Sequence, residues 1–195
     1  LMRQVRLLPV APRPLDDELL SCWHWRVASH YSSSPQRVES WISGTPGGQN
    51  QDFFTGDFHP DQSAIRVWAR ACRIREGDLD RMSLQSVRRP KTSIVSDPMD
   101  RGLCPLCLDE DAEERRDHYC RRSWVSVDAV VCPRHGIGLE NNCARCFRSG
   151  LFQFRQTPAG VVRLFCRNCG KVVSGRGFQR RDQAELVQVA TVIRD

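Results

Sequence analysis

The chain has 195 residues, a formal net charge of +6 and 40 % hydrophobic residues, which suffices for one or two small domains with modest cores. No stretch approaches the roughly 18 apolar residues of a membrane span, and the first residues lack the apolar core of a signal peptide. We therefore exclude a membrane-spanning protein and expect a cytoplasmic one, in a reducing compartment. The charge is uneven, because residues 1–100 carry +1 (13 basic, 12 acidic) and residues 101–195 carry +5 (16 basic, 11 acidic).

The first half of the chain predicts short helices. Apolar residues recur every three to four positions over residues 15–29, behind a proline and two acidic residues that suit a helix start. Ser34 and the proline after it predict a capped helix over residues 35–43, which Gly44 ends. Residues 45–60 predict an ordered loop held by three aromatic side chains, Phe53, Phe54 and Phe58.

Two further helices are predicted close together, at residues 61–72 and 76–83, joined by a turn at residues 73–75. Two helices joined by a tight turn are typical of a helix-turn-helix. The second of them carries Arg81 but also three acidic residues, which oppose entry into the major groove of DNA. A packing or protein-contact role for this pair is therefore favoured.

Cysteine and histidine pairs dominate the second half of the chain. A two-residue spacer lets a tight turn direct both side chains at one metal ion. Disulfides are the alternative, but ten cysteines among 195 residues are too few for a disulfide scaffold and a reducing compartment disfavours them. Four such pairs occur, and their members are Cys104, Cys107, Cys132, His135, Cys143, Cys146, Cys166 and Cys169.

The spacing divides these ligands into two sites. Nineteen residues separate the third pair from the fourth, as in a Cys₄ zinc ribbon, so residues 143–169 predict one site. The remaining Cys₃His set over residues 104–135 predicts the other. We therefore expect two structural Zn²⁺ ions, each holding its own ribbon. Cys22 and Cys72 are expected in the helical core, and Cys120 as a free or core thiol.

Basic residues are concentrated around the second site. From residue 141 to residue 181 there are nine arginines and lysines and no acid. Such a surface favours nucleic acid or an acidic protein, although a basic surface can also serve solubility alone. The candidate contact residues are Arg145, Arg148, Arg163, Arg167 and Lys171. Arg121, Arg122 and Trp124, between the halves of the first site, are expected to brace it.

Catalysis is disfavoured by the same residues. Both predicted sites have four protein ligands, whereas a catalytic zinc keeps one position for water or substrate. The chain has no His-x-Glu of a zinc deaminase and no Gly-rich phosphate loop. Asp117 and His118 faintly suggest a nuclease, but the acid-rich residues 109–117 are interpreted as a solvated loop.

Several short motifs surround the ligands in a particular order. They are Asp-Glu-Leu-Leu-Ser-Cys-Trp at 17–23, Cys-Pro-Leu-Cys-Leu-Asp-Glu-Asp at 104–111, Tyr-Cys-Arg-Arg-Ser-Trp at 119–124, Val-Cys-Pro-Arg-His-Gly at 131–136, and then Leu139 and Cys143-Ala-Arg-Cys. This succession resembles the TniQ family of transposition proteins over about residues 7–169. Cys120 departs from the family pattern. Many relatives also continue into further domains, whose functions are not transferred to this chain.

The resemblance implies both an architecture and a function. It implies a mainly α, helix-turn-helix-like N-terminal domain and two zinc-finger elements. From composition and periodicity we place the helical domain at residues 1–92, a basic linker up to about residue 103, and two zinc-binding ribbons with short strands and a C-terminal amphipathic helix at residues 104–195. That helix is predicted at residues 182–193.

The implied function is a non-catalytic bacterial adaptor that links target recognition to an AAA+ ATPase regulator of a transposase. The recognition module is target DNA or, in CRISPR-associated transposons, an RNA-guided effector. The alternative is a stand-alone sequence-specific DNA-binding regulator.

Overall fold

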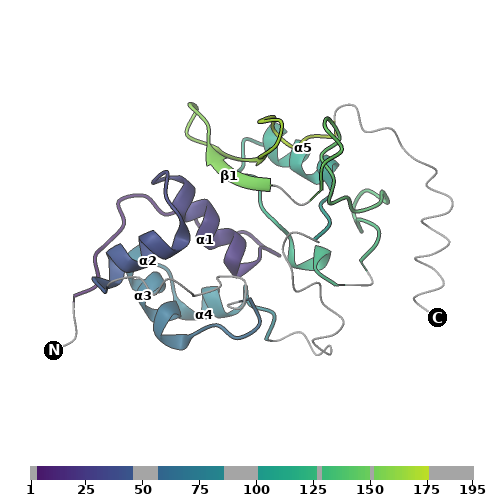
Figure 1. Ribbon diagram of the computed structural model, residues 1–195. Coiled ribbons are helices and arrows are strands. Elements are labelled where there is room, and N and C mark those ends of the chain that lie inside the picture. The colour runs from purple at the N-terminus through teal and green to yellow at the C-terminus, as the bar shows by residue number, and fades with distance from the viewer. Residues whose placement is uncertain (1–3, 46–56, 86–100, 127–128, 150–151, 176–195) are drawn as a thin grey trace. The chain divides into compact units, whose positions relative to one another are not determined.

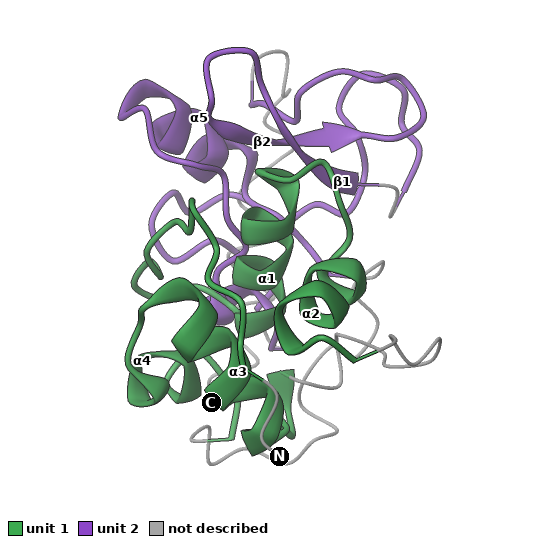
Figure 2. Ribbon diagram, turned by 90° about the vertical axis from the view of Figure 1, so that its left-hand side faces the viewer, with its two compact units in different colours: residues 1–88 green, residues 89–195 purple. Residues whose placement is uncertain are grey.

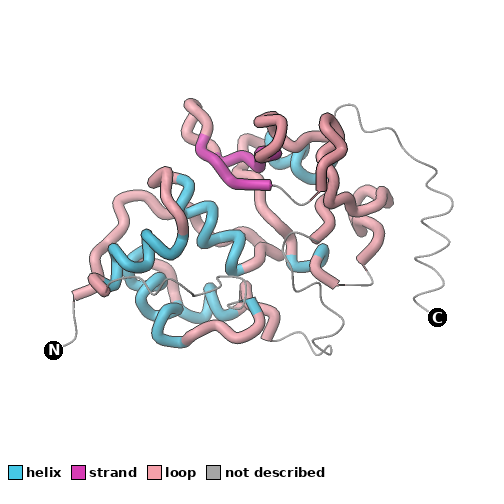
Figure 3. The backbone as a smooth tube through the Cα atoms, in the orientation of Figure 1, coloured by secondary structure: helices cyan, strands magenta, loops and turns pink. Residues whose placement is uncertain are grey.

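The computed structural model describes residues 4–45, 57–85, 101–126, 129–149 and 152–175. The chain divides into two compact units, Leu1–Arg88 and Arg89–Asp195, which Figure 2 shows in different colours. The first unit is helical, and the second holds a short helix and a two-stranded sheet (Figures 1 and 3). The second unit also contains two clusters of Cys and His. The predicted fold class is thereby confirmed. The predicted C-terminal helix at residues 182–193 lies outside the described residues.

The described residues of the helical unit form four α-helices. They are α1 (Leu20–Ser29), α2 (Pro35–Ser43), α3 (Gln62–Cys72) and α4 (Glu76–Asp80). Helix α2 begins as predicted, because the Ser34 hydroxyl accepts a hydrogen bond from the backbone of Arg37, and it ends at Gly44, whose φ is 67°. Helix α3 is capped in the same way by Asp61.

The prediction for the first helix was wrong at its start. Asp17 has a left-handed backbone, with φ 59°, and the carboxylate of Glu18 accepts a hydrogen bond from the backbone of Leu15. These contacts close a turn, so the helix begins only at Leu20. Helix α4 is also shorter than predicted, since it ends at Asp80.

The core of the helical unit forms around two tryptophans. The Trp23 and Trp68 rings meet edge to face at 5.8 Å, and the His24 ring lies 4.4 Å from Trp68. Cys72 belongs to this cluster and Cys22 is buried too, as predicted. Of the predicted aromatic loop, Phe53 and Phe54 lie outside the described residues, and Phe58 is half-buried.

Asp57 anchors the described part of that loop. Its carboxylate accepts hydrogen bonds from the backbone and the hydroxyl of Ser21, at 2.8 and 2.6 Å. Its carbonyl accepts a bond from the backbone of Leu84. A buried polar side chain therefore fixes this segment to α1.

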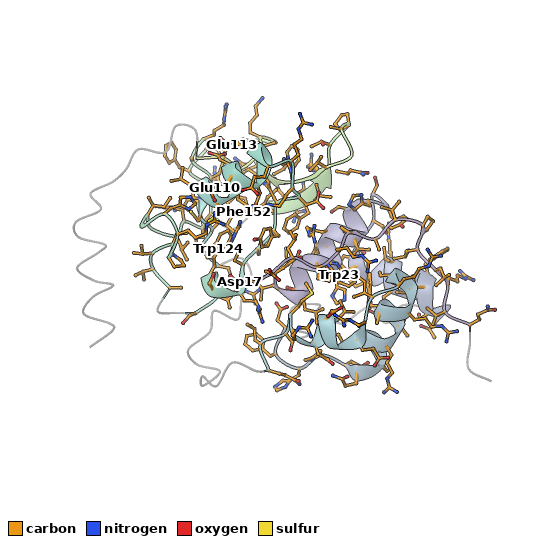
Figure 4. The ribbon with its side chains drawn as sticks, turned by 180° about the vertical axis from the view of Figure 1, so that it is seen from behind. Asp17, Trp23, Glu110, Glu113, Trp124 and Phe152 are labelled. Atoms are coloured by element: carbon orange, nitrogen blue, oxygen red, sulfur yellow. The ribbon has the colours of Figure 1, made fainter. Side chains whose placement is uncertain are left out.

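The zinc-binding unit contains helix α5 (Pro105–Glu113), a 3₁₀ turn (Arg122–Trp124) and the antiparallel strands β1 (Phe152–Gln156) and β2 (Val162–Cys166). Its core combines Leu103, Leu108, Trp124, Ile137 and Leu164 with three of the cysteines, and the half-buried Phe152 packs against it (Figure 4). Residues of both predicted ribbons contribute to this one core.

Candidate metal centres

The first candidate centre is formed by Cys104, Cys107, Cys132 and His135. Their ligand atoms all lie within 4.8 Å of one another. The Nδ1 atom of His135 lies 3.4, 3.3 and 3.6 Å from the three sulfurs, and the sulfurs of Cys107 and Cys132 are 3.6 Å apart. Three sulfurs and one nitrogen thus surround a common centre.

The second candidate centre has four sulfurs. Cys143 lies 3.7 Å from Cys169, and Cys146 lies 3.7 Å from Cys166, so each contact joins the two pairs. All four sulfurs lie within 4.8 Å of one another. The structure thus gathers the eight candidate ligands into the two sets that their spacing predicts.

These distances fit Zn²⁺. Zinc–sulfur bonds of about 2.3 Å and zinc–nitrogen bonds of about 2.0–2.1 Å place sulfurs about 3.8 Å apart, and sulfur and nitrogen about 3.5 Å apart, in a tetrahedron. A disulfide would need sulfurs about 2.05 Å apart, and none of the ten cysteines, all of which lie in the described residues, forms a disulfide. With four ligands from the protein, each centre is closed, which is typical of a structural metal site.

Three of the four ligand pairs share one backbone geometry. In each, the carbonyl of the first cysteine accepts a hydrogen bond from the residue four positions on, at 2.8–2.9 Å. The accepting residues are Cys132, Cys143 and Cys166, and the donors are Gly136, Phe147 and Gly170. All three donors have a left-handed backbone, with φ of 63°, 56° and 67°. We call this arrangement a knuckle.

The first ligand pair is built differently. Cys104 precedes helix α5, and Cys107 lies in its first turn, behind Pro105. The helix therefore carries one ligand of the metal centre and directs its following residues past that centre.

Glu110 is a functional residue that the sequence reasoning did not single out. It lies one turn after Cys107 on α5 (Figure 4), where its carboxylate accepts a hydrogen bond from Nε2 of His135 at 2.9 Å. With Nε2 held in this way, Nδ1 of His135 faces the three sulfurs, and such partners orient metal-binding histidines. Arg134 pairs with the same carboxylate at 2.8 Å. The signal available in the sequence was the spacing, because Glu110 comes three residues after Cys107 and such residues are neighbours on one face of a helix.

A buried ion pair braces the first centre. Asp111 is fully buried and accepts a hydrogen bond from the guanidinium of Arg121 at 2.9 Å. That guanidinium also lies over the rings of Tyr119 and Trp124, at 4.1 and 4.8 Å. Burial raises the pKa of the Asp111 carboxyl, and the charges of Arg121 and Arg116 oppose that rise. The bracing role predicted for Arg121 and Trp124 is confirmed.

Asp117 and His118 connect the first centre to the sheet. The Asp117 carboxylate accepts a hydrogen bond from the backbone of Val162, and His118 Nδ1 accepts one from the backbone of Leu164. Burial lowers the pKa of His118 to about 3, which suits a neutral structural imidazole. The interpretation of residues 109–117 as a solvated loop was wrong, because helix α5 occupies most of that segment and Asp111 is buried.

The five candidate contact residues differ in their exposure. Arg163 is half-buried, and its guanidinium donates hydrogen bonds to the carbonyls of Arg116 and Val162. It thus joins β2 to the segment after α5. The other four are exposed on the two knuckles of the second centre, and they are Arg145, Arg148, Arg167 and Lys171. Cys120 is half-buried against the core and belongs to neither ligand set.

Comparison with known proteins identifies one family. A family model described as TniQ matches residues 9–139, which is two thirds of the 195 residues. The match includes helices α1 to α4 and all four ligands of the first centre, and it ends before Cys143, the first ligand of the second. No curated protein matches the chain. Among the described residues, no helix is long and apolar enough to cross a membrane.

Proposed function

The chain belongs to the TniQ family of transposition accessory proteins, and we propose that it is a non-catalytic adaptor. In this role it links target-site recognition, by DNA or by an RNA-guided effector, to an AAA+ ATPase regulator that recruits the transposase. The observation that carries the proposal is the closed first centre, which lies within the family match.

Closed coordination supports a structural use of the metal. A catalytic zinc polarises a water or a substrate in an open position, and four protein ligands leave none. The ions would instead hold α5, the knuckles and the sheet in one rigid unit. We infer that this unit presents a fixed surface to a partner.

The distribution of charge supports contact with an acidic protein or a nucleic acid. Four cationic side chains are exposed on the two knuckles of the second centre, and the sequence between residues 141 and 181 contains no acid. A surface of one sign attracts a partner of the opposite sign and accelerates the encounter.

The alternative, a sequence-specific DNA reader, has weaker support. Helix α4, the candidate recognition helix, has only five residues, and three of them are acidic. Arg75 and Arg81 at its ends both pair with Asp78, and with Glu76 and Asp80 beside them the segment 75–81 has two basic and three acidic residues, a net charge of −1. A major-groove helix instead presents donors to base edges and cations to phosphates.

The proposal is tested by binding of the full chain to an AAA+ ATPase of the transposition-regulator class, in the presence of ATP and DNA. We expect the ATPase to be retained on the immobilised chain. Arg167→Glu with Lys171→Glu is expected to weaken retention at unchanged zinc content, because these cations would contact the DNA present in the assay. A matched control, Arg66→Glu with Arg70→Glu on α3, makes the same change in charge on exposed residues of the other unit.

Two outcomes would contradict the adaptor. One is that the wild-type chain does not retain the ATPase. The other is that the isolated chain prefers one duplex sequence over random DNA by about a thousandfold or more, as specific DNA readers do.

A further inference from the structure

Phe147 is the most exposed large apolar side chain of the described residues. Its exposed fraction is 76 %, against 52 % for Val10 and 46 % for Trp41. It lies directly after Cys146, a ligand of the second centre. Its ring is not part of the hydrophobic core of the zinc-binding unit.

The backbone makes this position more unusual still. Phe147 is the left-handed residue of its knuckle, with φ 56°, and glycine fills the equivalent position in the other two knuckles. Left-handed backbone is unfavourable for a bulky residue and costs glycine nothing sterically. The two glycine knuckles show that the turn closes without any side chain here. Folding therefore does not explain the ring, and strain of this kind is found where a residue serves a contact.

The surroundings of the ring are cationic. Arg145 and Arg148 are exposed on the same knuckle, and Arg167 and Lys171 are exposed on the knuckle that faces it across the metal centre. The two knuckles meet there because their four sulfurs lie within 4.8 Å of one another. We call these four cations and Phe147 the ribbon surface.

We propose that the ribbon surface binds single-stranded nucleic acid, with the Phe147 ring stacked on an unpaired base and the four cations on the flanking phosphates. Proteins that bind single strands combine a positive surface with exposed aromatic rings in this way. The inference deepens the proposed function by assigning a ligand class to one surface, and it does not depend on the ATPase.

A duplex and an acidic protein fit this surface less well. Paired bases are stacked on one another and offer an exposed ring no face, so a duplex would use the cations alone. Protein interfaces share the aromatic residues and arginines of this surface, but their centres are apolar and depleted of charge overall and of lysine, whereas four cations accompany a single ring here. Val172, 39 % exposed, is the other large apolar side chain exposed in the described part of the second ribbon.

The test is fluorescence anisotropy with the full chain and four labelled probes of about 16 nucleotides, the upper site size of single-strand binding folds. The probes are single-stranded DNA, single-stranded RNA, an abasic strand of equal charge, and a duplex. Phe147→Gly removes the ring and restores the residue that the other knuckles use, so zinc content and folding are retained. We expect it to weaken binding of base-bearing single strands by about 5- to 100-fold, and to leave the abasic strand and the duplex unchanged.

Further variants separate the ring from the charges. Phe147→Trp is expected to keep the affinity for single strands, and Trp41→Ala, at an exposed aromatic of α2, is expected to change nothing. Arg145→Gln with Arg148→Gln is expected to weaken binding of all four probes and to reduce the salt dependence of single-strand binding by about 1.4 in slope.

Three results would overturn the inference. They are no measurable binding of single strands by the wild-type chain, an equal effect of Phe147→Gly on abasic and base-bearing strands, and a loss of ATPase retention by Phe147→Gly with single-strand binding intact. The last result would assign the ring to the protein partner and leave the adaptor function standing. Conversely, single-strand binding without ATPase retention would contradict the adaptor and support the ribbon surface.

Discussion

Removing the carboxylate of Asp111 is the sharpest test of how the zinc-binding unit is held together. Asp111 lies on α5, four residues after the ligand Cys107, and it pairs with Arg121, which braces the first centre. Asp111 is not itself one of the candidate metal ligands. Asp111→Ala deletes the buried partner of Arg121 and leaves all eight cysteine and histidine ligands in place. We therefore expect a loss of stability without a direct loss of metal coordination.

The size of the effect follows from the burial of the pair. Asp111 is fully buried, and the side chain of Arg121 is 4 % exposed. At an effective dielectric constant of about 20, charges about 4 Å apart interact by about 4 kcal/mol. Deleting one partner of a buried pair costs about 3–5 kcal/mol, because the other charge stays buried and uncompensated. Arg116, 37 % exposed, offers no replacement, since it adds a second positive charge.

The measurement is urea-induced unfolding, with the release of zinc to a chromophoric chelator as the signal. Zinc release reports the zinc-binding unit, whereas tryptophan fluorescence reports mainly the helical unit, since Trp124 is the one tryptophan outside it. The matched control is Glu113→Ala, at an exposed acid on the same helix, with an expected change within about 0.5 kcal/mol. Asp111→Leu with Arg121→Met removes both charges and is expected to recover most of the lost stability.

A cost below about 1 kcal/mol for Asp111→Ala would refute this reasoning, because that is the range of exposed ion pairs. A double variant no more stable than Asp111→Ala would refute it too, since the loss would then not arise from an uncompensated Arg121.

Three further predictions concern the metal centres and the helical core. Cys107→Ser and Cys166→Ser should each lower the zinc content from two ions to one or fewer, and full retention of zinc in either variant would contradict the ligand assignment. Glu110→Gln should keep both ions but weaken zinc affinity at the first centre by about 10- to 100-fold in chelator competition, whereas an unchanged affinity would mean that the carboxylate does not orient its histidine. Burial lowers the pKa of His24 from 6.5 to about 3, so the stability that its neutral form contributes is present above pH 6.5 and is lost as the pH falls. Between about pH 7.5 and 5.5 the free energy of unfolding of the helical unit should fall by about 1.4 kcal/mol more in the wild-type chain than in His24→Gln. The measurement is urea unfolding monitored by tryptophan fluorescence. Equal falls in the two proteins would show that the imidazole titrates normally.

Much of the site could be predicted from local patterns. Ligand spacing is a short-range property, because a two-residue spacer within a tight turn brings both side chains to one ion wherever the turn lies. The cap at Ser34 and the end at Gly44 are local in the same sense, and both are as predicted. The order of the motifs around the ligands also sufficed to indicate the family.

The remaining features depend on contacts between distant residues. Residues 109–117 are acid-rich, and that composition favours a solvated loop. In the structure α5 occupies most of the segment and buries Asp111, because Arg121, ten residues further on, compensates its charge. Asp117 and His118 likewise acquire their partners 45 and 46 residues away, on β2. No local pattern records such pairings.

The sequence by itself determined which residues can hold zinc, where α2 and α3 begin, and to which family the chain belongs. All of these depend on spacing along the chain. Only the tertiary structure decided that the two ribbons share one core, that Arg163 is directed inward, and that Phe147 is exposed on a strained backbone. The physical reason is that burial and charge pairing depend on which distant residues the fold places next to a side chain. The exposure of Phe147 could be interpreted only by comparing its knuckle with the two other knuckles of the same geometry.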